Sequence, residues 1–478
     1  MTKLNRTSHF NYLSYFGLLA LFGAGIWGIL VIGSRIDHPN NEPHTSVSTA
    51  VTYSAPAAES KGADKFLQLS ARSPLSILLL QIVVIIVVAK LFGAIFRRIA
   101  QPPVMGEMVA GIVLGPSVLG WVWPSAAEFL FPSTSMTTLG VLSQIGVVLF
   151  MFIVGMELDL NHLRQKAAAA IMVSHASIII PFLLGSGFAL TLFPALAPAG
   201  TSFTPFGLFL GIAMSITAFP VLARILKDRG LAQLPLGSTA LACAAVDDVT
   251  AWCILAVVVA IVNSSGLAGA LLTMASAVIF VLLMLLLVKP RFDALISRRV
   301  EDPKYSRLLL AGVLAFALMS AWLTETIGIH ALFGGFIAGV VMPSTPSVET
   351  FLKEKIEAFS STVLLPLFFV FTGLRTQITL LNDRRSWLIC VGIVAVAVAG
   401  KLGGSMLMAR WTKMSWRDSF AIGALMNTRG LIELVVLNIG YDLGILSGRI
   451  FVMMVIMALT TTFMTAPLLS LAKVGKAR

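Results

Sequence analysis

The fold is decided by residues 241–262, which read LACAAVDDVTAWCILAVVVAIV. The stretch is long and apolar enough to cross a bilayer, which takes about 20 residues, yet Asp247 and Asp248 lie side by side within it. A charged side chain at the centre of a membrane helix costs ~2.5–3.5 kcal/mol on insertion scales. Two adjacent aspartates therefore indicate either a structural ion pair or polar clamp between helices, or a cation or proton site inside a transporter.

The rest of the chain has the composition of a membrane protein. Of its 478 residues, 57% are hydrophobic and 12% are charged, a balance that soluble globular domains do not have. About fourteen apolar segments are long enough to span a bilayer. They are residues 12–33, 75–96, 103–121, 137–156, 166–193, 205–226, 235–263, 266–288, 305–325, 329–343, 353–376, 386–409, 417–440 and 449–472. The pattern predicts an all-α polytopic membrane protein with about 13–14 transmembrane helices.

The net charge of +12 does not indicate a nucleic-acid-binding protein, because the basic residues gather in alternate short loops. Loops around Arg97 and Arg298 are basic, whereas loops such as 194–204 are almost uncharged, and Arg384 and Arg385 are the exception. Cytoplasmic loops of membrane proteins carry an excess of lysine and arginine. We therefore expect a multi-pass protein of the cell (inner) membrane, with both termini in the cytoplasm.

The N-terminal part lies outside the main run of apolar segments. Residues 1–34 predict a retained anchor helix, with a signal peptide as the alternative, since the apolar run is long for a signal sequence. Residues 35–74 are rich in Ser, Thr, Pro, Ala and Asn, which is typical of an extracytoplasmic linker. Residues 75–472 are predicted to form one helical membrane domain, followed by a short cytoplasmic tail at 473–478.

Three pairs of similar segments recur in the same order along the chain. The pairs are PVMGEMVAGIVLGP (103–116) with IHALFGGFIAGVVMP (329–343), LFMFIVGM (149–156) with LFFVFTGL (367–374), and residues 215–220 with 427–430. The loop charges place the start of the first half outside and the start of the second half inside. The chain is therefore expected to contain inverted repeats, a common transporter design.

The third pair of segments predicts two broken helices that cross near the bilayer midplane, because Pro220 and Gly430 interrupt them. Facing half-helices leave unpaired N–H and C=O ends, which Arg429 and Glu433 are placed to neutralise. The polar residues of the two breaks either bind an ion or only hydrogen-bond helix to helix. They are Ser215, Thr217, Asn427 and Thr428.

Lys401, in AVAGKLGG (397–404), is the expected counter-charge for the aspartates. Asp247 and Asp248 lie about 100° apart around a helix, so they cannot point at one spot. A buried lysine–aspartate ion pair is costly to form, so the gain or loss of a proton readily shifts the equilibrium between its charged and neutral forms. A proton-coupled carrier needs this chemistry. The chain has no P-loop, HExxH or nucleophile motif, so we expect neither an enzyme nor a cofactor.

Four motifs resemble the second family of monovalent cation:proton antiporters. They are QPPVMGE (101–107), SITAFPVLAR (215–224), AAVDDVTAW (244–252) and MNTRGLIEL (426–434). The last is especially similar to the cation/proton exchanger branch, which includes plant proteins. The resemblance covers residues 75–472 and implies an antiporter domain, built as a homodimer of core and dimerisation bundles with an elevator-like motion of the core.

The resemblance also implies roles for individual residues. Asp248 resembles the carboxylate that binds cation and proton alternately, and Asp247 resembles the neighbour that pairs with a lysine matching Lys401. Thr217, Asn427 and Thr428 fall in the unwound crossings. An Asp-Asp pair usually accompanies electrogenic exchange in the family, although the branch with Asn-Thr-Arg-Gly often has Asn-Asp.

We therefore predict a secondary active transporter that exchanges sodium or potassium for protons by alternating access. Electrogenic exchange is the favoured mode. The expected cation and proton site comprises Asp247, Asp248, Ser215 and Thr217, with the monovalent cation at Asp248 and backbone carbonyls assisting. One alternative is a sodium-coupled symporter for an organic anion, which would use helix N-termini and would not need the Asp-Asp and Lys401 set. Another is a potassium efflux channel, which would carry ions without moving protons.

Overall fold

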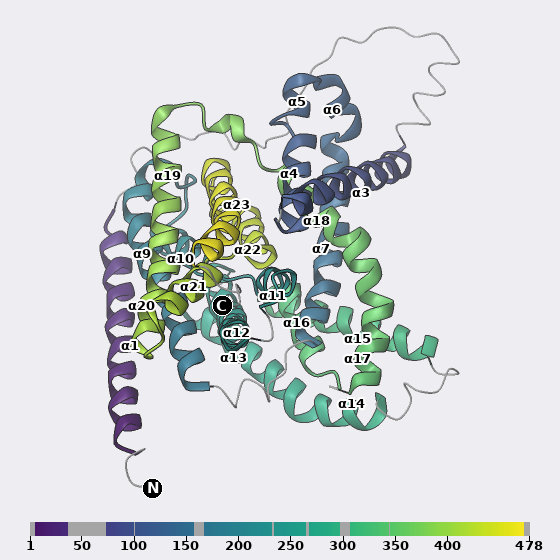
Figure 1. Ribbon diagram of the computed structural model, residues 1–478. Coiled ribbons are helices and arrows are strands. Elements are labelled where there is room, and N and C mark those ends of the chain that lie inside the picture. Colours follow the sequence, from purple (N-terminus) through teal and green to yellow (C-terminus); the bar gives the residue numbers. More distant parts are fainter. Residues whose placement is uncertain are drawn as a thin grey trace, which may run out of the picture. The chain divides into compact units, whose positions relative to one another are not determined.

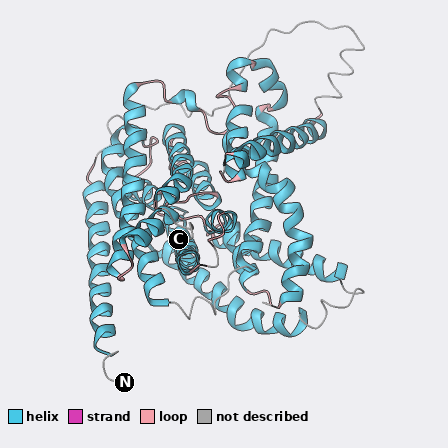
Figure 2. Cartoon of the chain, in the orientation of Figure 1, coloured by secondary structure: helices cyan, strands magenta, loops and turns pink. Residues whose placement is uncertain are grey.

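A computed structural model describes residues 5–36, 73–99, 101–156, 167–231, 234–263, 267–296, 306–343 and 345–472. All regular secondary structure in these ranges is helical, as Figures 1 and 2 show. Most of the predicted linker 35–74, and all of the predicted tail 473–478, lie outside the described residues.

The predicted class, an all-α polytopic membrane protein, is confirmed. By length and composition, ten helices in the described ranges can cross a bilayer, and they coincide with ten of the apolar segments predicted from the sequence. The other four predicted segments are also helical. Residues 12–33 lie in α1 (Asn5–Gly33), residues 329–343 contain the short α16 (Ala331–Val340), and residues 205–226 and 417–440 are interrupted helices.

The chain divides into two compact units, one of which contains residues 44–159 and 259–379. Its α-helices, besides α16, are α3 (Pro74–Arg98), α4 (Pro103–Leu114), α5 (Leu119–Val122), α6 (Pro124–Leu130), α7 (Ser133–Met156), α13 (Leu267–Leu283), α14 (Lys289–Ile296), α15 (Ser306–Ile327), α17 (Pro346–Leu352) and α18 (Leu365–Leu374). Wider π-helical turns at Met284–Val288, Lys353–Glu357 and Ser360–Leu364 join some of them.

In this unit the two short glycine-rich helices pack against helices from the opposite repeat. A Cβ on Gly111 of α4 would lie 2.3 Å from the carbonyl oxygen of Val370 in α18. A Cβ on Gly339 of α16 would likewise lie 2.0 Å from the carbonyl oxygen of Phe152 in α7. Because no side chain fits at either place, the helix backbones are in direct contact, as small residues allow in membrane helices.

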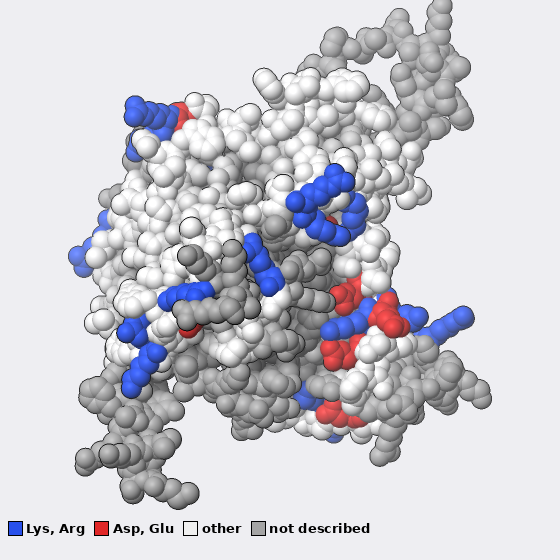
Figure 3. All heavy atoms as spheres, in the orientation of Figure 1, with Lys and Arg blue, Asp and Glu red and all other residues white. Residues whose placement is uncertain are grey.

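One face of α3 is apolar and exposed. Leu75, Leu79, Val83, Val87 and Leu91 recur every four residues, and each is more than half exposed. Residues four apart lie on the same helix face. The face drawn in Figure 3 likewise carries its charged side chains in small groups, with uncharged surface between them. Such surfaces are expected of helices that face lipid.

The other unit contains residues 1–43, 160–258 and 380–478. Its helices, besides α1, are α9 (Ala167–Leu196), α10 (Phe203–Ala213), α11 (Phe219–Asp228), α12 (Pro235–Asn263, which runs on past residue 258), α19 (Arg384–Val398), a π-helical turn at Ala399–Gly403, α20 (Gly404–Trp411), α21 (Trp416–Met426), α22 (Leu431–Asp442) and α23 (Gly448–Leu471). A long helix, a broken helix and a second long helix follow one another twice, as the repeat in the sequence predicted.

The two broken helices meet at their unwound segments, residues 214–218 and 427–430. The backbone N–H of Ala218 donates to the carbonyl of Thr428 at 3.0 Å, so the breaks are hydrogen-bonded to each other. Pro220 is the second residue of α11, where its missing N–H leaves no intrahelical bond unmade. The predicted pair of crossed broken helices is therefore confirmed.

Gly430 is needed for this close approach. A Cβ there would lie 2.6 Å from Val221 Cγ2 and 3.0 Å from Ala218 Cβ. We expect Gly430→Ala to lower the free energy of unfolding by ~1–3 kcal/mol, the usual cost of overpacking. Thermal unfolding of the purified protein in detergent would measure it. Gly312→Ala is the control, since a Cβ at Gly312 has no neighbour within 4 Å; equal melting temperatures for the two variants would show that the crossing tolerates a methyl group.

Candidate functional site

Asp247 is fully buried in α12 and accepts four hydrogen bonds. Its Oδ1 accepts one from Ser174 Oγ at 2.6 Å. Its Oδ2 accepts from Ser177 Oγ at 2.9 Å and from Thr217 Oγ1 at 2.6 Å. The fourth donor is Lys401 Nζ, also on Oδ2, at 2.9 Å. Asp247 therefore has four donors, one of them the ammonium group that forms its ion pair.

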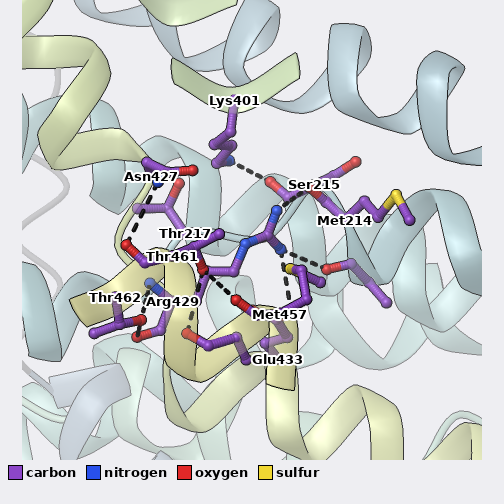
Figure 4. Close-up of polar contacts among 12 residues, drawn as sticks. Met214, Ser215, Thr217, Lys401, Asn427, Arg429, Glu433, Met457, Thr461 and Thr462 are labelled. Atoms are coloured by element: carbon purple, nitrogen blue, oxygen red, sulfur yellow. Dashed lines mark hydrogen bonds and ion pairs between the residues drawn. The ribbon is translucent and has the colours of Figure 1, made fainter. Parts of the chain in front are cut away.

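Lys401 is also fully buried, in the π-helical turn between α19 and α20. Besides Asp247, its ammonium group donates to the carbonyl of Ser177 at 2.9 Å and to the carbonyl of Ser215. Figure 4 shows the side chain reaching the first broken helix. An ammonium group has three protons to donate, so all of them have acceptors. Lys401 therefore ties α9, the first break and α12 together.

Arg429 crosses from the second break to the first. Its Nη1 donates to the carbonyl of Ala213 at 2.7 Å, and its Nη2 donates to the carbonyl of Met214 at 2.6 Å. These carbonyls form the C-terminal end of α10, where a positive charge is favourable. Glu433 Oε1 lies 3.2 Å from Nη1, and Glu433 stands in the first turn of α22, where a negative charge is favourable. Figure 4 shows this ion pair beneath the first break.

Backbone carbonyls of the broken helices were expected to assist the cation, but those of residues 213–215 are bound by Lys401 and Arg429 in this structure. Ser215 contacts Lys401 through its backbone carbonyl, whereas its hydroxyl group donates to the carbonyl of Gly211 in its own helix at 2.6 Å. Thr217 Oγ1 bonds Asp247, and it lies 3.1 Å from the carbonyl oxygen of Met426 in the second broken helix. Both residues lie at the crossing, but neither hydroxyl is directed at Asp248.

Asp248 differs sharply from its neighbour. It is only 3% exposed, and among the described residues neither of its oxygens has a hydrogen-bond partner. The backbone N–H of Phe219 is close enough to interact electrostatically, but it is outside hydrogen-bond geometry. Asn427 Oδ1, in the second break, is another buried acceptor without a donor among the described residues. A buried acceptor without a donor is unfavourable, so Asp248 is the group that a proton or a cation would stabilise most.

Sequence reasoning missed the two serines that hold Asp247. Ser174 and Ser177 stand in α9 within the apolar stretch MVSHAS. Their spacing of three residues puts both hydroxyls on one face of the helix. That spacing is the one signal that could have identified them, and it is weak, because buried serines commonly bond only to their own helix.

We expect Ser174→Ala to lower the free energy of unfolding by ~1.5–3 kcal/mol, the usual contribution of a hydrogen bond to a charged group. Ser186→Ala is the matched control, because Ser186 is equally buried in α9 but donates to a neutral carbonyl, that of Gly207, at 3.0 Å. The control should lose less, ~0.5–1.5 kcal/mol. Chemical denaturation of both purified variants would compare them. An equal loss would mean that the ionised Asp247 does not depend on Ser174.

The fold and these contacts define a class of protein. Inverted repeats with crossed broken helices, and ionisable residues at their crossing, are the architecture of secondary transporters. The family described as "Sodium/hydrogen exchanger, transmembrane" matches residues 83–471. The chain belongs to the sodium/hydrogen exchanger family, whose members are transporters and not enzymes.

Curated relatives support the same assignment. The chain is 45% identical to the Na(+)/H(+) antiporter NhaS4 of Synechocystis over 395 residues, 82% of this chain and 96% of the relative. It is 40% identical to Cation/H(+) antiporter 17 of Arabidopsis thaliana over 84% of this chain, and 32% identical to K(+)/H(+) antiporter 1 of Saccharomyces cerevisiae, also over 84%. The chain spans about half the length of the plant and yeast proteins, 49% and 47%.

A solved structure has the same fold. The sodium proton antiporter MjNhaP1 of Methanocaldococcus jannaschii superposes with a TM-score of 0.62, covering 84% of this chain and 99% of that protein. The sequence identity is 15%, so this likeness concerns the fold alone.

Proposed function

We propose that this protein exchanges a monovalent cation, sodium or potassium, for protons by alternating access, with Asp248 binding each in turn. One observation carries the proposal. Among the described residues Asp248 is buried without a hydrogen-bond donor, whereas Asp247 beside it has four. A buried carboxylate that the protein leaves uncompensated is stabilised by any small cation or proton that reaches it.

Coupling follows from competition at this one group. A cation binds the deprotonated carboxylate, so protonation of Asp248 expels it, and the loss of a proton allows the next cation to bind. Each ligand shifts the equilibrium between the outward-open and inward-open forms only to the extent that it binds one form more tightly than the other. Thr217 and Lys401 hold Asp247 at the crossing, so their role in this proposal is to maintain the shape and charge of the site.

Electrogenic exchange is the second part of the proposal. The buried pair of Asp247 and Lys401 supports it, since opening of that pair would provide a second group to exchange protons. A proton flux that changes with an imposed membrane potential, at fixed ion gradients, would be expected. A flux independent of the potential would mean that Asp248 alone exchanges, one cation for one proton.

The choice of ion is addressed by reconstitution. The named relatives include a Na(+)/H(+) antiporter and a K(+)/H(+) antiporter, so both ions are candidates. Proteoliposomes that contain a pH-sensitive dye would receive sodium, potassium or lithium in turn, with choline as the inert cation. Cation-specific proton movement is expected. Cation flux without proton movement would indicate a channel, and no response to any cation would redirect the assay to organic anions.

We further propose that residues 75–472 form the antiporter domain of a homodimer in the cell (inner) membrane, with both termini cytoplasmic. The alternation of basic and uncharged loops supports this orientation. Residues 1–34 would then be an anchor helix, which the continuous helix α1 supports, and residues 35–74 an extracytoplasmic linker. Labelling of single cysteines placed in these segments, with membrane-impermeant reagents on intact cells, would test the orientation; a reactive C-terminal cysteine would contradict it.

A further inference from the structure

Three consecutive residues of the second break are each held by a threonine of α23. The threonines Thr461, Thr462 and Thr465 are buried and lie on one face of the helix. The contacts run from Asn427 Nδ2 to the Thr461 carbonyl at 3.4 Å, from Thr428 Oγ1 to Thr465 Oγ1 at 3.2 Å, and from the backbone of Arg429 to Thr462 Oγ1 at 2.9 Å. Figure 4 shows Thr461 and Thr462 beside the break.

Thr462 makes the most specific of these contacts. Its Oγ1 accepts from the backbone N–H of Arg429 and donates to the carbonyl of the same residue, both at 2.9 Å. A hydroxyl group can donate and accept at once. Since unwinding deprives both backbone groups of helical partners, one side chain replaces two lost bonds. Thr462 is 2% exposed and Arg429 is 1% exposed, so bulk water does not reach the pair.

The residue that Thr462 holds is the one that bridges the two breaks. The guanidinium group of Arg429 donates to the carbonyls of Ala213 and Met214, next to the Ser215 carbonyl that binds Lys401. The position of the Arg429 backbone therefore decides whether its side chain covers the end of α10. A shift of this backbone would change the charge and shape of the crossing beside Asp247.

We infer that Thr462 is a positioning residue for the exchange, which holds the second break so that Arg429 neutralises the end of the first half-helix. Thr461 and Thr465 assist on either side of it. The inference rests on the proposed function, since its main readout is exchange. It adds a residue of α23 to a site otherwise built from α9, α12, the Lys401 turn and the two broken helices.

Thr462→Val tests the inference, because valine has nearly the same shape but no hydroxyl group. The apparent KM for the transported cation is expected to rise about tenfold, equivalent to ~1.4 kcal/mol, and the pH profile of exchange should shift while the maximal rate changes little. Thr462→Ser keeps the hydroxyl and should restore both values.

Thr460→Val is the control. It makes the same change on the same helix, at a hydroxyl that makes no hydrogen bond to residues 427–430 in the described chain. An unchanged KM and pH profile in Thr462→Val, or a serine variant as impaired as valine, would overturn the inference.

Hydrogen–deuterium exchange of the full-length protein gives a readout that does not depend on transport. The amide of Arg429 should exchange faster in Thr462→Val and in Thr462→Ala than in the native chain or in Thr460→Val. The alanine variant keeps the test available if valine does not yield folded protein. If the native chain moves no cation, the proposed function fails, but this comparison still decides whether Thr462 holds the backbone of Arg429. Equal exchange in all four proteins would refute it.

Discussion

Replacing Asp248 by asparagine is expected to reduce cation-dependent proton flux to the level of liposomes without protein. Asparagine keeps the shape of the side chain, but it neither ionises nor carries the exchanged proton. The same change should leave the melting temperature unchanged or raise it, because it removes a buried charge that has no hydrogen-bond donor among the described residues. Flux assays and thermal unfolding on the same preparation would measure both.

Asp418→Asn provides the control for this substitution. Asp418 is half-buried in the first turn of α21, outside the crossing, so the same chemical change there should leave the flux unaltered. Full activity in Asp248→Asn would place the exchanging carboxylate elsewhere and would contradict the proposed mechanism. A large drop in the melting temperature would instead attribute the loss of flux to misfolding.

Replacing Lys401 by methionine is expected to cause the largest loss of stability. Asp247 would be left buried without its counter-charge, and removal of one partner of a buried ion pair costs ~3–5 kcal/mol. Exchange should be lost as well, because Lys401 also holds the Ser215 carbonyl of the first break. Denaturation midpoints and flux in proteoliposomes would measure the two effects.

A double variant separates charge from packing. Lys401→Met combined with Asp247→Asn removes both charges and should recover most of the stability, though not the exchange. Lys353→Met breaks an ion pair with Glu349 that is partly exposed, so it should cost less than about 1 kcal/mol. If the double variant is no more stable than Lys401→Met alone, the unpaired charge is not the cause of the loss.

Apolar segment length, the two breaks and the buried ionisable residues could all be read from the chain. The bilayer imposes a cost on each residue separately, so a run of apolar residues, a mid-span proline and an adjacent pair of aspartates stand out without knowledge of their neighbours. Lys401 and Arg429 stood out for the same reason. The similar segments at 103–116 and 329–343 likewise indicated repeats, although not that each short helix packs against the opposite repeat.

The partners of these residues depended on the tertiary structure. Thr217 bonds Asp247, not Asp248, and Arg429 reaches a carbonyl 216 residues away at Ala213. Ser174 and Thr462 gave at most a weak signal in the sequence, since a hydroxyl group in an apolar helix most often bonds to its own backbone. A hydrogen bond requires two groups within about 3 Å in a suitable direction. The polarity of each residue is a local property that the chain itself specifies, whereas that distance exists only once the helices have crossed.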